Sequence, residues 1–362
     1  MKFKPHIEAI HRYLINDVDR SPFLRLDKNE FSFPFPPPIL EEIRAAVGDY
    51  LLQAYPSTHD TLNHAAILLE HADENQILLT SGSDYALKLC YEALGHPGDR
   101  VALPNPTYAM NEVYAQLAEM SIVPLPYGRD LKLAQDHLFA SLGQAAMIVL
   151  ANPNQPTGRR ENDQLIRELL DKTSARQQWL IIDEAYHAFS GYTAAHYVDD
   201  FDNLIVIRSF SKSYGIAGLR VGAIISQKKN IDYFAKVLPV YPVNALALEV
   251  LRILSQHKPY FAALHQELRC GRDLIIAFYN SLKCHAFPSD ANFVMVETHG
   301  VFDLPSYLDH LKRQRILVRG PWTTPPFTQA FRVTTTTSPQ VECLKQATLS
   351  YLDNRQPKGN QP

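Results

Sequence analysis

The sequence has few of the features that mark secreted, metal-binding or membrane-spanning proteins. Only four cysteines occur among its 362 residues. The spacing of Cys90, Cys270, Cys284 and Cys343 gives no CxxC pair, which argues against a disulfide framework or structural zinc and favours a reducing compartment. No uninterrupted apolar run approaches the roughly 18 residues of a membrane span, and no apolar signal-peptide core follows Met1. We expect a cytoplasmic protein with no membrane partner and no metal.

An excess of charge of either sign is also missing. The formal net charge is −3, charged residues make up 20% and hydrophobic residues 46% of the chain. These values are typical of an ordinary globular protein and predict no nucleic-acid partner. The length allows one large domain or two unequal domains, each with its own core.

Short apolar runs alternate with helical patterns over much of the chain. Most of these runs are continuous, as expected for strands buried on both faces, and helices such as 83–94 and 162–171 separate several of them. The pattern predicts an α/β fold with a mostly parallel seven-stranded sheet flanked by helices. The predicted strands are 76–80, 100–103, 121–125, 146–150, 179–182, 204–207 and 221–225. From about Pro242 the pattern changes to long amphipathic helices, which predicts a smaller α+β domain.

Polar and glycine residues follow several of the predicted strands. Ligands bind at these carboxyl ends in open parallel sheets. Ser81–Asp84 opens a helix, and such an N-terminus suits a phosphate, although Ser83 as a simple N-cap explains the same residues. Asp183, at the end of a buried strand, needs a cationic or hydrogen-bonding partner, and is either a functional carboxylate or a cap of a neighbouring loop or helix. Lys212 lies in Ser209–Arg220 among hydroxyls, glycines and an arginine, and is either a surface cation or a nucleophile.

These three sites fit one cofactor when they are taken together. A carboxylate beside a pyridinium nitrogen, a lysine that forms an imine and a set of phosphate donors are the protein's contribution to pyridoxal-phosphate catalysis. The combination therefore predicts a pyridoxal 5'-phosphate enzyme.

The chain resembles the fold-type-I pyridoxal-phosphate aminotransferases, and within them the histidinol-phosphate aminotransferase group, with threonine-phosphate decarboxylase as a close relative. The motifs that carry the resemblance occur in order along nearly the whole chain: Leu26–Glu30, Tyr55-Pro56, Ser81–Asp84, Asn105–Tyr108, Asn152–Gly158, Asp183–Tyr186, Ser209–Arg220, Tyr241–Val243, Ala291–Phe293, Val318-Arg319 and Phe331–Val333.

The resemblance implies a role for each matching residue. Lys212 would hold the cofactor through an imine and then move the substrate's proton as general base and acid. Asp183 would keep the ring nitrogen protonated, Tyr186 would donate to the phenolic oxygen, and Tyr108 would stack on the ring. Further contacts to the cofactor, chiefly to its phosphate, would come from Gly82, Ser83, Asp84, Ser209, Ser211 and Arg220.

The resemblance also implies substrate contacts and a partner subunit. Arg332 would bind the substrate carboxylate bidentately, and Arg319, Asn29 and Tyr13 are further candidates for the substrate pocket. Tyr55 would reach the cofactor phosphate of a second subunit, which implies a homodimer with shared active sites.

Two departures from the family pattern concern the pocket. The family has asparagine directly before Pro-Thr-Gly, where its amide binds the phenolic oxygen. This chain has Gln155 there, with Asn154 one step earlier, and either amide is a candidate. Thr334–Thr337 replaces a glycine-containing segment after Arg332, so we expect a different wall beside the carboxylate site.

The expected function is transamination, the transfer of an amino group between an amino acid, or an amino-alcohol phosphate such as histidinol phosphate, and a 2-oxo acid such as 2-oxoglutarate. The alternative is decarboxylation or elimination with cyclisation of a phosphorylated amino acid on the same residues. The expected organisation is an N-terminal arm joining the small domain (1–35), a large cofactor-binding domain (36–240), a small C-terminal domain (241–353) and a flexible tail (354–362).

Overall fold

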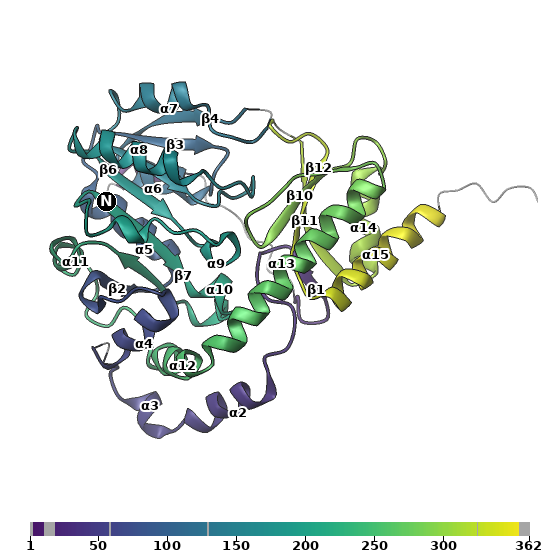
Figure 1. The fold of residues 1–362 in the computed structure, drawn as a ribbon, viewed down its shortest axis with the longest axis horizontal. Coiled ribbons are helices and arrows are strands. Elements are labelled where there is room, and N and C mark those ends of the chain that lie inside the picture. Colours follow the sequence, from purple (N-terminus) through teal and green to yellow (C-terminus); the bar gives the residue numbers. More distant parts are fainter. Residues whose placement is uncertain (1–2, 11–18, 58, 129, 324, 355–362) are drawn as a thin grey trace, which may run out of the picture.

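The protein contains two β-sheets joined by a long helix (Figure 1). The computed structural model describes residues 3–10, 19–57, 59–128, 130–323 and 325–354. The predicted tail beyond residue 354 and the candidate Tyr13 lie outside this range. The domain boundaries stay a prediction.

The larger sheet has seven strands in the order β2-β8-β7-β6-β5-β3-β4. Only β8 runs against its neighbours, because it pairs antiparallel with both β2 and β7. Each apolar run expected to be a strand is one, so the prediction of a mostly parallel seven-stranded sheet is confirmed. The strands are β2 (Ile77–Thr80), β3 (Arg100–Asn105), β4 (Ser121–Pro126), β5 (Met147–Ala151), β6 (Trp179–Asp183), β7 (Leu204–Ser209) and β8 (Gly222–Ile225).

Both faces of this sheet are covered by helices. In β5, Ile148 and Leu150 belong to one hydrophobic cluster while Met147 and Val149 belong to the other, as the two-residue period of a strand requires. α5 (Ser83–Leu94), α6 (Met110–Leu117) and α11 (Lys228–Phe234) supply the second cluster. The first cluster contains residues of α2 (Pro37–Ala46), α4 (His59–Leu69), α7 (Gln135–Ser141), α8 (Asp163–Ser174) and α12 (Ala245–Gln256).

Short helices connect the main elements. Two of them lie at the carboxyl edge of the sheet: α10 directly follows β7, and α9 follows β6 after three residues. The short helices are α1 (Pro5–Glu8), α3 (Asp49–Gln53), α9 (His187–Ser190) and α10 (Phe210–Ser213), with 3-10 turns at Glu74–Gln76, Ala195–Tyr197 and Ala217–Leu219.

The smaller sheet has five strands in the order β1-β11-β12-β10-β9. β1, from the N-terminal segment, pairs parallel with β11 at one edge. Helices α14 (Leu304–Arg313) and α15 (Ser338–Asp353) pack on one face of it. The strands are β1 (Leu24–Leu26), β9 (His285–Ala286), β10 (Phe293–Glu297), β11 (Ile316–Trp322) and β12 (Ala330–Thr334).

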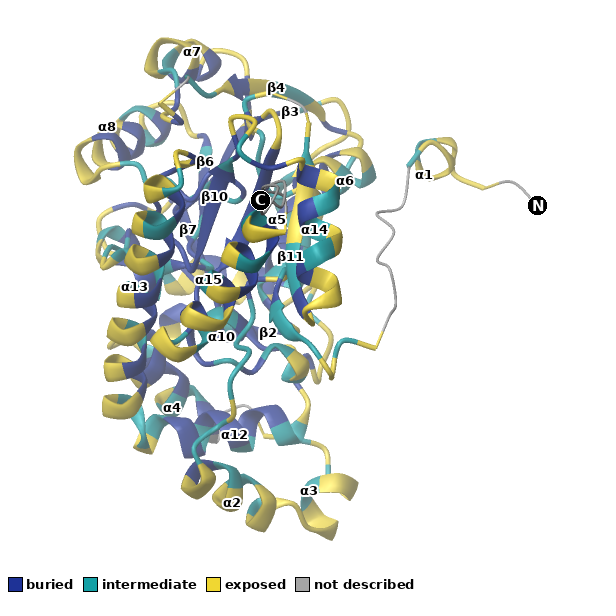
Figure 2. Ribbon diagram, turned by 90° about the vertical axis from the view of Figure 1, so that its right-hand side faces the viewer, coloured by how far each residue is buried: buried dark blue, intermediate teal, exposed yellow. Residues whose placement is uncertain are grey.

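Helix α13 (Lys258–Ser281) runs from the larger sheet to the smaller one (Figure 1). Leu264 and Leu268 in its first half belong to the core of the larger sheet, whereas Ile275 and Tyr279 in its second half belong to the core of the smaller one. A buried stripe runs along its length, with exposed residues on its outer side (Figure 2). The helix is therefore a shared structural support for both sheets.

The threonine run Thr334–Thr337 packs against α13. Thr335 Oγ1 donates to the carbonyl of Leu268 at 2.6 Å, and Thr336 Oγ1 donates to the side chain of Gln340. Thr334 to Thr336 are buried. The hydroxyls of Thr335 and Thr336 thus bond to α13 and α15, and a different wall beside the carboxylate site stays a prediction.

None of the described helices is long and apolar enough to cross a bilayer, and the described His, Cys, Asp and Glu side chains form no group of three or more that could bind a metal ion.

Gly271, in the middle of α13, allows the threonine run Thr334–Thr337 to pack closely against this helix. A Cβ at this position would overlap the carbonyl oxygen of Thr336. We expect Gly271→Ala to lower the free energy of unfolding by roughly 1–3 kcal/mol, because a backbone clash outweighs the better helix propensity of alanine. Urea denaturation measures this, with Gly143→Ala as the control because its Cβ meets nothing closer than 3.9 Å. Equal stability of the two variants would contradict the prediction.

Candidate functional site

Three predicted groups meet at the carboxyl edge of the larger sheet. Asp183 is the last residue of β6, Lys212 lies in α10 directly after β7, and Gly82 and Ser83 form the turn from β2 into α5. Adjacent parallel strands end at the same edge, which brings side chains from distant parts of the sequence together.

Lys212 lies in a positively charged, poorly solvated environment. Its Nζ donates to the carbonyl of Lys28 at 3.0 Å. Burial, and then the charges of Arg332 and Arg220, lower the pKa of Lys212 to about 8, against the opposing effect of Glu30. A lysine amine with such a pKa is available as a nucleophile and base near neutral pH.

Among the described residues, no cation is recorded as a partner of the Asp183 carboxyl group. Burial, and the nearby charges of Asp84 and Glu184, raise the pKa of Asp183 to about 7, although the N–H of Ala185 donates to it at 3.0 Å. A buried carboxylate is stabilised by a cationic N–H donor. The environment of Asp183 therefore suits a protonated ring nitrogen.

The turn between β2 and α5 forms a cradle for an anion. A Cβ on Gly82 would lie 2.8 Å from Nη2 of Arg220, and a Cβ on Gly222 would overlap the backbone nitrogen of Ser83. Both positions therefore need glycine to keep the backbone N–H groups of the α5 N-terminus beside the guanidinium. The buried Ser209 and Ser211 lie on the neighbouring segment that ends β7 and begins α10.

Two tyrosines of the site are held by hydrogen bonds. Tyr108 donates to Oδ1 of Asp84 at 3.1 Å, and the hydroxyl of Tyr186 accepts from Nδ2 of Asn29 at 3.0 Å. Burial raises the pKa of both phenols. Both therefore stay protonated near neutral pH and remain able to donate a hydrogen bond.

The two candidate amides differ in their surroundings. Asn154 is buried, its Oδ1 accepts from Thr107 at 2.8 Å, and its Nδ2 donates to Pro106 O and Thr157 Oγ1 at 3.1 Å each. The partly exposed Gln155 forms no side-chain hydrogen bond with the described residues. The amide of Asn154 thus holds its own loop, and Gln155 is the amide available to a ligand.

The smaller sheet contributes two arginines. Arg332 and Arg319 are register partners on β12 and β11, so they share a face of the sheet. The guanidinium of Arg332 lies over the rings of Phe293 and Trp322, at 5.2 and 5.7 Å from their centroids. Phe331 and Val333 point to the opposite side, into the core under α14 and α15. The alternation along β12 therefore directs Arg332 away from that core.

Residues 27–31, here called the N-terminal strap, contact the site repeatedly. The carbonyls of Asp27 and Lys28 accept from Arg332 Nη2 (2.8 Å) and from Lys212, and Asn29 bonds to Tyr186. A Cβ on Gly215 would overlap the ring of Phe31, so the strap also covers the lysine loop. The sequence predicts none of these contacts, because backbone acceptors leave no mark in a sequence, and it offers Asn29 only as a candidate for the substrate pocket.

Tyr55 lies on the surface of the molecule. Its side chain is 79% exposed and stacks on Tyr241, with ring centroids 4.4 Å apart.

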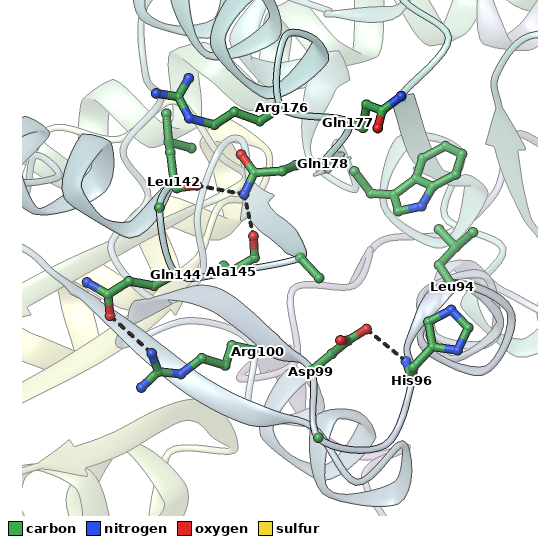
Figure 3. A pocket seen from close by; sticks show the side chains of 14 residues that line it. Leu94, His96, Asp99, Arg100, Leu142, Gln144, Ala145, Arg176, Gln177 and Gln178 are labelled. Atoms are coloured by element: carbon green, nitrogen blue, oxygen red, sulfur yellow. Dashed lines mark hydrogen bonds between the residues drawn. The ribbon is translucent and has the colours of Figure 1, made fainter.

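A separate hollow of about 750 Å³ lies at the opposite edge of the larger sheet (Figure 3). Its lining includes Arg100, at the start of β3, and Trp179, at the start of β6. It holds none of the predicted site residues.

Comparisons with known proteins agree with this geometry. Residues 21–347 match the model of the family "Aminotransferase class I and II". The chain is 32% identical over 310 residues to histidinol-phosphate aminotransferase 1 of Burkholderia lata, which covers 83% of this chain and 84% of the relative. It is 30% identical over 321 residues to histidinol-phosphate aminotransferase of Chromobacterium violaceum, covering 87% and 88%.

Solved structures share the fold. Histidinol-phosphate aminotransferase from Sinorhizobium meliloti, in complex with pyridoxal-5'-phosphate, superposes with a TM-score of 0.85 at 22% identity over 98% of both chains. L-threonine-O-3-phosphate decarboxylase from Porphyromonas gingivalis superposes with a TM-score of 0.76 at 20% identity over 91% of this chain and 99% of the other.

The lysine, the carboxylate and the anion cradle at one sheet edge fit pyridoxal 5'-phosphate, and the family match covers most of the chain. The chain therefore belongs to the aminotransferase class I and II family and is a pyridoxal-phosphate-dependent transaminase.

Proposed function

We propose that this transaminase takes its amino group from an amino-alcohol phosphate such as histidinol phosphate and passes it to a dicarboxylic 2-oxo acid such as 2-oxoglutarate. The observation that carries the proposal is the direct opposition of Arg319 and Arg332 on β11 and β12. Arginines bind carboxylates and phosphates through two parallel hydrogen bonds, so two arginines on one face of a sheet suit an anionic group of a substrate. Both substrates carry an anionic group suited to the pair, and the named function of the relatives supports this choice.

Bound pyridoxal phosphate acts as an electron sink for the bond that breaks at the substrate's Cα. We assign the proton transfer at Cα to Nζ of Lys212, because its lowered pKa leaves the amine available as a base. Asp183 would accept from the ring nitrogen, and Tyr186 and Gln155 would bond to the phenolic oxygen, with Asn154 in a supporting place. Tyr108 would stack on the ring, and Asn29 orients Tyr186. The phosphate would be held by Gly82, Ser83, Ser209, Ser211 and Arg220, while Asp84 holds Tyr108.

We further propose a homodimer with shared active sites. Large apolar side chains are exposed on α3 and on the segment before α12, where Tyr50 is 84%, Leu52 70% and Val240 83% exposed. The stacked pair of Tyr55 and Tyr241 links the two segments into one surface. An exposed apolar surface of this kind is typical of an interface, and a second copy would receive Tyr55 near its cofactor phosphate.

The four cysteines are free thiols, which supports the cytoplasmic location that we propose.

A panel of amino donors with 2-oxoglutarate tests the reaction and the substrate together. We expect histidinol phosphate to give glutamate with the highest kcat/KM, because its phosphate binds between Arg319 and Arg332. The measurements are glutamate formation and loss of the visible absorbance of the bound cofactor. Arg319→Gln should lower kcat/KM for the phosphorylated donor roughly tenfold to a hundredfold, the loss of one charge-assisted contact. Release of carbon dioxide without glutamate would instead identify a decarboxylase.

The pKa of Asp183 gives a pH signature in the protein without cofactor. The folded state holds a proton on Asp183 up to about pH 7, whereas the unfolded state loses it near 3.8. The folded state therefore binds more protons between these values, and its free energy of unfolding falls as pH rises through them. We expect the free energy of unfolding of the wild type to fall by a few kcal/mol between about pH 4 and about pH 8. Asp183→Asn should remove this fall. Denaturant unfolding at both pH values measures it, and identical pH dependence of the two proteins would count against it.

Subunit mixing tests the shared site. Lys212→Ala should abolish activity, and Tyr55→Ala should reduce it strongly. If each site combines Lys212 of one subunit with Tyr55 of the other, mixed dimers regain one intact site each, so about a quarter of the wild-type sites return after random reassociation. Activity after joint refolding reports this. No recovery, in spite of mixed dimers shown by mass spectrometry, would place Tyr55 outside the partner's site.

A further inference from the structure

Three side chains on one face of α13 donate hydrogen bonds away from the helix. His265, Arg269 and Arg272 are spaced by four and three residues, which puts them in one row. We call this row the α13 donor stripe. Nε2 of His265 lies 2.5 Å from the carbonyl oxygen of Ser213, Nη1 of Arg269 lies 3.0 Å from that of Ala188, and Nη1 of Arg272 lies 3.5 Å from that of Phe189.

The acceptors all belong to the two short helices at the carboxyl edge of the larger sheet. α9 follows Tyr186 directly, and α10 contains Lys212 next to Ser213. Each helix has four residues, so its carbonyls lack a following turn to bond. Donors from another element are therefore needed to fix the orientation of these helices, and the α13 donor stripe supplies them.

The ring of His265 is itself held in place. It packs edge-on against Phe189 and Tyr214, at centroid distances of 5.5 and 6.1 Å. A carbonyl only accepts, so Nε2 must carry the hydrogen. Burial, and the charge of Arg269, lower the pKa of His265 against the effect of the Ser213 carbonyl, which favours the neutral imidazole near neutral pH.

A second hydrogen bond holds Ser213, the residue whose carbonyl His265 contacts. Ser213 Oγ donates to the carbonyl of Ser209 at 3.3 Å, so the residues before and after Lys212 are tied together. Ser209 and Ser211, the proposed phosphate ligands, belong to this same segment. A shift of Ser213 would therefore move the lysine relative to the cradle.

The same helix also contacts the strand of Arg332. Thr335, three residues after Arg332, donates to the carbonyl of Leu268 on α13 at 2.6 Å. His265 lies three residues before Leu268, less than one helical turn away. α13 thus sets the distance between the arginine of the smaller sheet and the lysine of the larger one.

We propose that His265 is a positioning residue for Lys212: its bond to the Ser213 carbonyl holds the lysine segment in the place set by α13. The inference rests on the proposed role of Lys212 in the reaction. His265 itself contacts none of the proposed cofactor ligands through a hydrogen bond in the described structure.

His265→Leu removes the donor and keeps an apolar side chain, and His265→Gln keeps an N–H donor at a similar reach. The first measurement uses the protein without cofactor: competitive acetylation of Lys212 as a function of pH, read by mass spectrometry. In wild type we expect half-reaction near the lowered pKa of about 8. In His265→Leu the loosened lysine is better solvated, so its pKa should rise by about one unit toward the ordinary value, and His265→Gln should restore it.

The second measurement uses the enzyme with bound cofactor. We expect His265→Leu to lower kcat roughly tenfold while KM for the amino donor changes less than about twofold, because misplacing the proton-transfer group affects the chemical step. The pH titration of the cofactor's visible absorbance should shift together with the acetylation profile. His265→Gln should keep kcat within about threefold of wild type.

His310→Leu is the matched control. His310 is another half-buried histidine that bonds a helix carbonyl, that of Ala347 at 3.0 Å, but it lies on α14 beyond the smaller sheet. It should lower stability and leave both Lys212 profiles unchanged. If His265→Leu behaves like His310→Leu, or if glutamine fails to restore the acetylation profile, His265 is only structural and the proposal is overturned. Because acetylation needs no cofactor or substrate, its result stands apart from the substrate panel.

Discussion

The cost of removing charge from water at the carboxyl edge of the larger sheet constrains the rest of this structure. Lys212 and Asp183 are both shifted toward their neutral forms, mainly by burial. An amine and a carboxylic acid held in this way each interact favourably with a complementary group of the cofactor, the aldehyde carbon and the protonated ring nitrogen. The parallel strands supply the geometry for this edge, because they end together and leave the following residues to form the site.

The second sheet completes the site and depends on the first through α13. Arg332 and Arg319 are register partners on this sheet, and the charge of Arg332 also lowers the pKa of Lys212. The N-terminal strap connects the two sheets again, because Asp27 bonds to Arg332 and Lys28 bonds to Lys212. Arg332 and Lys212 thus come from different sheets of one chain, so the lowered pKa of Lys212 depends on how the two sheets are held together.

The larger sheet and its polar edge could be predicted because buried parallel strands are continuous apolar runs, and the residues that follow them carry the chemistry. Lys212, Asp183 and the Gly82–Ser83 turn each follow such a strand. The contacts of the N-terminal strap and of the α13 donor stripe could not be predicted in the same way. Their acceptors are the backbone carbonyls of Lys28, Ser213 and Ala188, which any residue provides, so only the folded chain shows which ones are used.

The folded loop distinguishes the two candidate amides at the position where Gln155 departs from the family pattern. Asn154 and Gln155 both offer an amide, and sequence spacing leaves both open. The two amides differ in the hydrogen bonds that they already make: Thr107, Pro106 and Thr157 use both ends of the Asn154 amide. Turning this amide toward a ligand would leave buried polar groups without partners, at a cost of about 1–3 kcal/mol for each lost bond. Gln155 has no such bonds to lose, and its extra methylene lengthens its reach. The hydrogen bonds therefore favour Gln155 for the proposed contact to the cofactor, while those of Asn154 hold its own loop.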